Sequence, residues 1–175
     1  RGLAVRAPGE PAFRLQCFDV LGILPTHSPD IALIDDRVFV ATVAGLQVFD
    51  VYGCRASTGG ALADVAVFDV RELPDGRLSV VSAQAGADND AYLSSDRGLT
   101  WQPLGVGRSD TLVSRFRSHE SGWIASGAWF DVDNGSVTFG LIRYAADLTP
   151  EYIPVELGDE GHRVWLLDRD VLRRE

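Results

Sequence analysis

The sequence predicts an all-β fold built from repeated four-stranded units, and three observations lead to this prediction. No window of 11 or more residues places apolar residues at helical spacing, whereas short β-rich runs alternate with turn signals. Asp75-Gly76 and Asn134-Gly135 are hairpin turn dipeptides, because both accept positive φ angles. Similar strands also recur at intervals of roughly 45–50 residues, which is typical of a repeat architecture.

The length and composition indicate one globular domain with its own core. The chain has 175 residues, of which 46% are hydrophobic and 23% charged. No apolar run approaches the roughly 18 residues of a membrane span. The net charge of −9, with no lysine, argues against a nucleic-acid partner, which requires a basic surface. The chain starts at Arg1 and contains no Met, so we expect a processed or excised piece.

In chain order, residues 1–12 hold two prolines and two glycines and are expected to form a leader segment. The runs that follow alternate between β-rich sequence and turn residues. The expected strands are residues 13–21, 38–43, 46–52, 64–72, 78–83, 91–95, 101–104, 112–117, 123–130, 136–144 and 152–156, and residues 161–172 resemble the first strand of a further unit.

The repeat is visible when corresponding strands are compared. We expect three phenylalanines to occupy equivalent first-strand positions about 50 residues apart, and three apolar residues to do so in the second strands about 40–45 residues apart. In the connection between the third and fourth strands, two glycines lie about 45 residues apart, and an aspartate occupies the corresponding position of the third unit. These residues are Phe18, Phe68 and Phe116; Val38, Leu78 and Trp123; and Gly53, Gly98 and Asp147.

One connection carries a specific pattern, S-x-D-x-G-x-T-W, formed by Ser94, Asp96, Gly98, Thr100 and Trp101. Serine and aspartate side chains accept hydrogen bonds from backbone amides a few residues further on, and so close a turn. Glycine supplies a backbone conformation that side chains disfavour. The indole then begins the next strand with a large apolar ring.

This pattern resembles the Asp-box of the sialidase-type (BNR) repeat, which joins the third and fourth strands of a β-propeller blade. The resemblance implies a structural role for the box at the blade periphery, away from any active centre. Residues 49–56 and 143–150 are degenerate boxes. The expected blades cover about residues 13–60, 61–108 and 109–158, and residues 159–175 begin another.

Closed propellers have about 4–8 blades. Three blades and part of a fourth therefore require either further blades in the same polypeptide or self-association of copies. A β-sandwich with accidental spacing is the alternative fold.

Three polar residues are expected to line the channel of such a fold: Asp19, Asp69 and Arg117. Asp19 and Asp69 each follow a first-strand phenylalanine. Paired carboxylates across a cleft are the groups that glycoside hydrolysis requires. Sialidases of this repeat family use an arginine cluster and a tyrosine nucleophile. By this resemblance Arg14, Arg115 and Arg117 are candidates for the cluster, and Tyr92 or Tyr144 for the nucleophile, although no residue-by-residue motif match supports the assignment. The alternative is that these residues are polar positions on half-buried strands or solvated surface arginines.

No metal site, cofactor site or catalytic triad is expected. Residues 131–136 differ from a calcium loop, because the glycine comes one residue early and position 12 is Ile142. His27, His119 and His162 lie in separate turn-like segments without a nucleophile at motif spacing. Cys17 and Cys54 are either two buried thiols or a disulfide of an oxidising compartment, and the sequence leaves both open.

The resemblance therefore implies a non-catalytic, extracytoplasmic (periplasmic, cell-surface or secreted) β-propeller module, which we expect to bind a protein or glycan ligand through loops at one rim. The alternative is a fragment of a sialidase-like glycoside hydrolase. We expect neither a nucleic-acid partner nor a membrane span in this segment.

Overall fold

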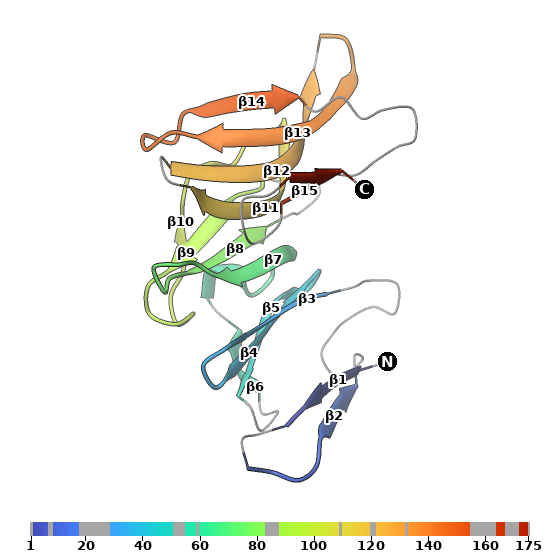
Figure 1. The fold of residues 1–175 in the computed structure, drawn as a ribbon, viewed down its shortest axis with the longest axis vertical. Coiled ribbons are helices and arrows are strands. Elements are labelled where there is room, and N and C mark those ends of the chain that lie inside the picture. Colours follow the sequence, from blue (N-terminus) through green and yellow to red (C-terminus); the bar gives the residue numbers. More distant parts are fainter. Residues whose placement is uncertain are drawn as a thin grey trace.

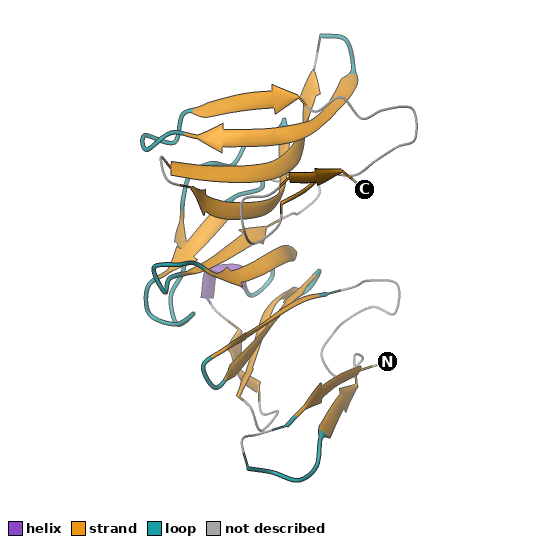
Figure 2. Cartoon of the chain, viewed as in Figure 1, coloured by secondary structure: helices purple, strands orange, loops and turns teal. Residues whose placement is uncertain are grey.

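The computed structural model is all-β, as the sequence predicts. The structure describes residues 2–6, 9–17, 29–50, 55–58, 60–82, 88–108, 110–119, 122–131, 133–154, 164–166 and 172–174. Within these ranges nearly all regular structure is strand, and the one helical segment is the short 3-10 helix η1 (Gly60–Leu62) (Figure 2).

Three four-stranded antiparallel sheets follow one another along the chain, and in each of them every strand pairs with its sequence neighbour (Figure 1). The first sheet contains β3 (Asp30–Ile34), β4 (Arg37–Thr42), β5 (Gly45–Asp50) and β6 (Arg55–Thr58). The second contains β7 (Val67–Glu72), β8 (Leu78–Ser82), β9 (Ala91–Ser94) and β10 (Gln102–Pro103). The third contains β11 (Thr111–His119), β12 (Gly122–Asp131), β13 (Ser136–Tyr144) and β14 (Pro150–Pro154).

Two further sheets have two strands each. β1 (Gly2–Val5) pairs with β2 (Arg14–Cys17), and β15 (Val164–Leu166) pairs with β16 (Leu172–Arg174). The β1–β2 pair lies beyond the first sheet in Figure 1, whereas β15 contacts β12 of the third sheet. The described strands do not form a closed ring.

Both predicted hairpin turns are confirmed. Gly76 (φ 79°) lies between β7 and β8, and Gly135 (φ 68°) lies between β12 and β13. In each turn the preceding residue fastens the backbone: the Asp75 carboxylate accepts a hydrogen bond from Arg77 N, and the Asn134 amide oxygen accepts one from Ser136 N. The local turn chemistry therefore sets the register of these two strand pairs.

The prediction for the start of the first sheet is wrong. Residues 13–21 were expected to be its first strand, but β2 within this range pairs with β1, which lies inside the expected leader. The first strand is β3, which pairs with β4 across the tight turn at Asp35 (φ 54°) and Asp36. Exposure alternates along β3 but residue type does not, because the exposed positions Ile31 and Leu33 are both apolar.

The expected equivalence of the first-strand phenylalanines is also wrong. Leu78 and Trp123 lie at or next to the start of the facing second strands, where they pair with Glu72 and Ser118, and counting back two residues from these partners places Val70, not Phe68, at the position of Phe116. Phe68 lies at a bulge in β7 and is 46% exposed, whereas Phe116 is fully buried. Phe18, the third member of the set, lies outside the described residues.

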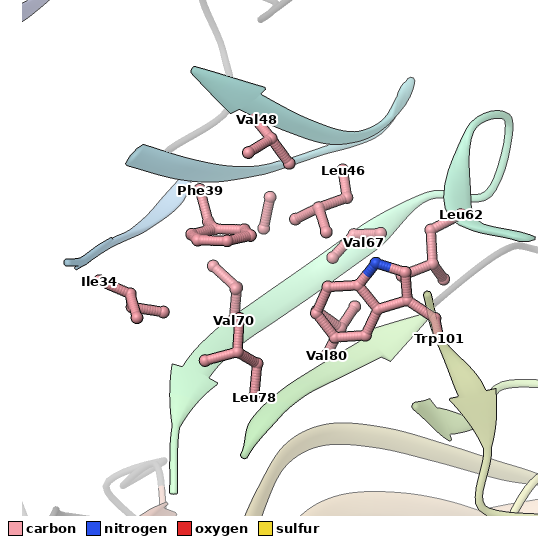
Figure 3. Packing of buried hydrophobic residues seen from close by; sticks show 11 residues of the cluster. Ile34, Phe39, Leu46, Val48, Leu62, Val67, Val70, Leu78, Val80 and Trp101 are labelled. Carbon is pink, nitrogen blue, oxygen red and sulfur yellow. The ribbon is translucent and has the colours of Figure 1, made fainter. Parts of the chain in front are cut away.

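Consecutive sheets pack face to face around two apolar clusters. One cluster joins residues of β4 and β5 to residues of β7 and β8, and it includes Trp101 (Figure 3). The other joins β8 and β9 to β11, β12 and β13 around Phe116. The first strands approach one another as well, since β7 contacts both β3 and β11. The second sheet is therefore packed between the first and the third.

Candidate functional site

Charged side chains gather where the three first strands approach one another. This group, termed the first-strand cluster, consists of Asp30 on β3, Asp69 and Arg71 on β7, and Arg117 on β11. Two of its members, Asp69 and Arg117, were predicted from the sequence to line a channel. The third predicted residue, Asp19, lies outside the described residues.

The centre of the cluster is an ion pair between neighbouring sheets. Arg117 Nη1 lies 2.7 Å from Asp69 Oδ2 and 2.7 Å from the Phe116 carbonyl oxygen. The side chains of Arg117 and Asp69 are only 10% and 2% exposed. Arg71 Nε lies 3.5 Å from the second carboxylate oxygen of Asp69. The Asp69 carboxylate is thus engaged by arginines on both sides, and the pair fastens β7 to β11.

Asp30 was not singled out in the sequence, yet it joins this cluster from the first sheet. Its Oδ2 accepts a hydrogen bond of 3.2 Å from Val70 N, across the interface between sheets. Burial, followed by the negative charge of Asp69, raises the pKa of Asp30 above the ordinary aspartate value. The structure therefore brings two carboxyl groups together, but the partner of Asp69 is Asp30, which no motif marks.

The S-x-D-x-G-x-T-W segment forms a closed turn between β9 and β10. Ser94 Oγ accepts a hydrogen bond from Gly98 N and donates one to Asp96 Oδ1. The Asp96 carboxylate also accepts hydrogen bonds from the amides of Leu99 and Thr100 and from the Thr100 hydroxyl, at 2.6–3.1 Å. Side chains of the turn thus satisfy backbone amides that no strand pairs.

This turn rests on the preceding sheet. Gly98 has a φ of 80°, and a Cβ there would lie 2.6 Å from Cε1 of Phe39 on β4. Arg37 Nη1 donates a 3.1 Å hydrogen bond to the Arg97 carbonyl oxygen. Trp101 is 6% exposed and inserts its indole among apolar residues of both sheets (Figure 3). The turn therefore joins two sheets as well as two strands, and its role here is structural.

A pH dependence follows from Asp96. Hydrogen bonds from the Thr100 hydroxyl and amide, and then from Ser94, lower the pKa of Asp96 from 3.8 to about 2. A lowered folded-state pKa stabilises the fold above pH 3.8, and this contribution is lost as the pH falls from 3.8 to about 2. We expect Asp96→Asn to be less stable than the parent at pH 6 and to lose less stability over that acid range. Urea unfolding between pH 2 and 6 measures both effects, with Asp88→Asn in an exposed connection as the control. Parallel pH profiles for parent and Asp96→Asn would contradict this assignment.

A second carboxylate organises the opposite end of the second sheet. Asp90 Oδ1 and Oδ2 accept hydrogen bonds from the amides of Val106 and Gly105, at 2.9 and 3.0 Å. No sequence motif marks Asp90 for this role. The carboxylate in fact ties the β8–β9 connection to the segment that leads into the third sheet.

Beside this end, the β12–β13 hairpin extends further than the equivalent hairpins of the other sheets. β12 and β13 have ten and nine residues, against five and four in β8 and β9. One face of the extension carries three exposed apolar side chains: Phe130 (50%), Val137 (44%) and Phe139 (54%). Phe130 pairs with Val137, and Phe139 lies opposite Ala128, so all three side chains share one face.

The other face of the hairpin is firmly packed. The Trp129 ring lies 5.0 Å from that of Tyr152, and a Cβ at Gly140 would lie 2.9 Å from Trp129. Phe130 N also donates a 2.8 Å hydrogen bond to the Asp110 carbonyl oxygen. The exposed apolar side chains therefore lie on a strand pair that is held in place by packing on its opposite face and by a backbone hydrogen bond.

The remaining predicted residues are dispersed. Arg115 lies on β11 and Arg14 on β2, in different sheets, whereas Tyr144 packs against Phe116 in the core. Burial, and then Tyr152, raise the pKa of Tyr144. Cys54, His27 and His162 lie outside the described residues, as does the side chain of Cys17. The described residues include no group of three His, Cys, Asp or Glu side chains able to hold a metal ion, and no helix long and apolar enough to cross a membrane.

Comparison with known proteins gives no relative: no family model, no curated protein and no solved structure matches this chain. The functional argument therefore depends on the geometry of the chain itself.

Proposed function

We propose that this chain is a β-propeller segment of the Asp-box type that acts as a non-catalytic, extracytoplasmic module for binding a protein. The observation that carries the binding function is the exposed apolar face of the β12–β13 hairpin, formed by Phe130, Val137 and Phe139. Exposed apolar groups held on a rigid support are typical of interaction sites. Phenylalanine and valine offer apolar area without hydrogen-bonding groups, which favours a protein ligand over a glycan.

Three features support the architecture in this proposal. Each four-stranded sheet is a meander packed against the next, the closed turn at residues 94–101 is fastened to the neighbouring sheet, and the first strands lie together. The ion pair between Asp69 and Arg117 supports a structural role for the first-strand cluster, because the two opposite charges neutralise each other.

The binding proposal predicts that peptides selected from a displayed random library will be rich in aromatic and aliphatic residues. Their affinity should fall at least about tenfold for the double variant Phe130→Ser/Phe139→Ser, since the central apolar contacts of an interface carry most of its energy. Fluorescence polarisation with a labelled selected peptide measures this change. Leu99→Ser, at a site 60% exposed in a different part of the chain, is the matched control.

If the selected peptide bound the double variant and the parent with equal affinity, the β12–β13 hairpin would not be the binding site. Binding to a glycan array, without selection of any peptide from the library, would contradict the proposal of a protein ligand.

The second candidate, a sialidase-like glycoside hydrolase fragment, is favoured by one observation. Asp30 lies beside a second carboxylate, and its raised pKa is a property that a general acid requires. Turnover of a chromogenic glycoside by the parent, abolished in Asp30→Asn with the fold intact, would replace the binding proposal. We expect no turnover across the panel.

A further inference from the structure

The three exposed apolar side chains of the β12–β13 hairpin, Phe130, Val137 and Phe139, form one small continuous surface, termed the hairpin patch. Phe130 faces Val137 across the strand pair, and Phe139 follows Val137 by two residues on the same face. Side chains directly opposite each other in a sheet lie about 5 Å apart, and those two residues apart on one strand lie about 7 Å apart. A surface of this extent accommodates one or two large side chains of a partner, so a short segment of the partner is enough to cover it.

The chain around the hairpin patch carries negative charge. Residues 118–142 include the whole hairpin and contain no arginine or lysine, whereas Asp131 and Asp133 lie at its turn. Asp133 is exposed. On the other side of β12, the Asp110 carbonyl oxygen accepts the hydrogen bond from Phe130 N, which places a further aspartate beside the patch. Acidic residues therefore border the patch toward the turn and toward β11, in a chain with a net charge of −9.

The arginines on the same face of the third sheet lie further from the turn. They are Arg115, Arg117 and Arg143. Arg117 pairs with Asp69 of the second sheet, and Arg143 Nε lies 2.8 Å from a carboxylate oxygen of Glu151 on β14. The end of the face that carries the hairpin patch therefore has acidic neighbours.

The phenylalanines of the patch favour a cation as well. The face of an aromatic ring attracts lysine and arginine side chains. This pairing occurs twice within the chain: the guanidinium carbon of Arg6 lies 5.2 Å from the centre of the Phe13 ring, and that of Arg77 lies 5.5 Å from the centre of the Trp123 ring. Exposed phenylalanines next to aspartates thus combine two groups that attract cations with an apolar surface.

We propose that the partner of the hairpin patch is a cationic segment of another protein, in which one or two large apolar side chains are flanked by lysine or arginine. The apolar side chains pack on the patch, and the cations lie near the carboxylates of Asp110 and Asp133. This inference rests on the binding function proposed above and adds the charge of the partner to it. Apolar contacts hold such a complex together, whereas exposed charges mainly raise its rate of formation and select the partner.

Three labelled nine-residue peptides test the inference. They share the core Phe-Ser-Leu-Ser-Phe and carry two lysines, two serines or two glutamates at each end. We expect the parent chain to bind the lysine peptide at least about tenfold more tightly than the glutamate peptide at low salt, with the serine peptide between them. Fluorescence polarisation gives the three dissociation constants.

Charge-neutral variants assign this preference to the aspartates. In Asp110→Asn/Asp133→Asn the preference for the lysine peptide over the glutamate peptide should fall below about threefold, because an amide keeps the shape of the carboxylate but not its charge. The control Asp36→Asn/Asp64→Asn removes the same charge from exposed positions outside the third sheet and should keep the preference. Circular dichroism verifies that both variants are folded.

Salt provides a measurement on the parent chain that needs no variant. Raising the NaCl concentration from about 0.05 to 0.5 M shortens the Debye length several-fold and screens exposed charges. The lysine peptide should then bind at least about fivefold more weakly, and the serine peptide less than about twofold more weakly. Equal salt dependence of the two peptides would contradict a charged contribution.

Equal affinity of the parent for all three peptides, or an unchanged preference in Asp110→Asn/Asp133→Asn, would overturn the inference and leave the binding function in place. If none of the three peptides bound, the inference would also fail, and the library selection described above decides the binding function separately. If all three bound Phe130→Ser/Phe139→Ser as tightly as the parent, the hairpin would not be the binding site and both proposals would fail.

Discussion

Replacing Trp101 with alanine is expected to lower the free energy of unfolding by about 3–5 kcal/mol, because it removes a buried indole from the contact between two sheets. The ring is 6% exposed and lies among apolar residues of the first and second sheets (Figure 3). Since a domain of this kind has a total stability of about 5–15 kcal/mol, the variant should unfold at a much lower urea concentration. Urea denaturation followed by far-UV circular dichroism measures the change.

Two controls accompany this experiment. Leu99→Ala lies in the same turn but removes a side chain that is 60% exposed, so its effect should be small. Trp101→Phe keeps an aromatic ring, and among the described residues the indole Nε1 has no hydrogen-bond partner to lose, so the loss should be smaller than for alanine. Equal effects of Trp101→Ala and Leu99→Ala would show that Trp101 does not join the sheets.

Breaking the ion pair between β7 and β11 is expected to have a similar effect. Arg117→Met leaves the Asp69 carboxylate buried beside Asp30 with the longer contact to Arg71 retained. Removal of one partner of a buried pair typically costs about 3–5 kcal/mol, and we expect a loss toward the lower end of this range. Replacing both partners, in Asp69→Leu/Arg117→Met, should restore most of that stability, because no uncompensated buried charge remains. Unfolding free energies of the two single variants and the double variant give the coupling energy.

The matched control is Arg77→Met, which breaks a solvent-exposed pair with Asp75 and should cost less than about 1 kcal/mol. A double variant as unstable as the sum of its single variants would mean that the two side chains do not interact.

The sequence was sufficient to predict the features that depend on local chemistry. The turns at Gly76 and Gly135 and the closed turn from Ser94 to Trp101 follow from residues close together in the chain. Strand alternation likewise located most strands of the second and third sheets. In these regions local preference and tertiary packing agree, which is the condition under which pattern reasoning succeeds.

The first strand of the first sheet and the partner of Asp69 were not predicted, although residues 38–43 and 46–52 correspond to β4 and β5. β3 pairs locally with β4, but its exposed residues Ile31 and Leu33 are apolar, so the sequence shows no polar–apolar alternation there. The contact between Asp30 and Val70 joins residues 40 apart in the sequence. Asp30 looks like a loop residue until β3 pairs with β4 and brings it beside β7.

Phe68 corresponds to Ser114 and not to Phe116, because each of these two residues lies at the bulge of its first strand, and a spacing of about 50 residues in the sequence does not mark a bulge. In the third sheet the positive φ belongs to Leu148, not to the predicted position Asp147, and no residue-type preference marks leucine for that conformation.

The apolar face of the β12–β13 hairpin shows the same limit. Its alternation was consistent with either a buried or an exposed face, since burial depends on what packs above it. Only the three-dimensional arrangement shows that Phe130 and Phe139 are exposed.

The account as a whole depends on consecutive four-stranded sheets stacked face to face, with the turn of one resting on the core of the one before. The nuclear Overhauser effect between the Gly98 α-protons and the Phe39 ring protons tests this contact most directly. The two residues are far apart in the sequence, and a Cβ on Gly98 would lie only 2.6 Å from Cε1 of Phe39. We predict a strong cross-peak and ring-current-shifted Gly98 resonances. Gly98 α-protons at ordinary shifts with no cross-peak to Phe39 would contradict the stacked arrangement.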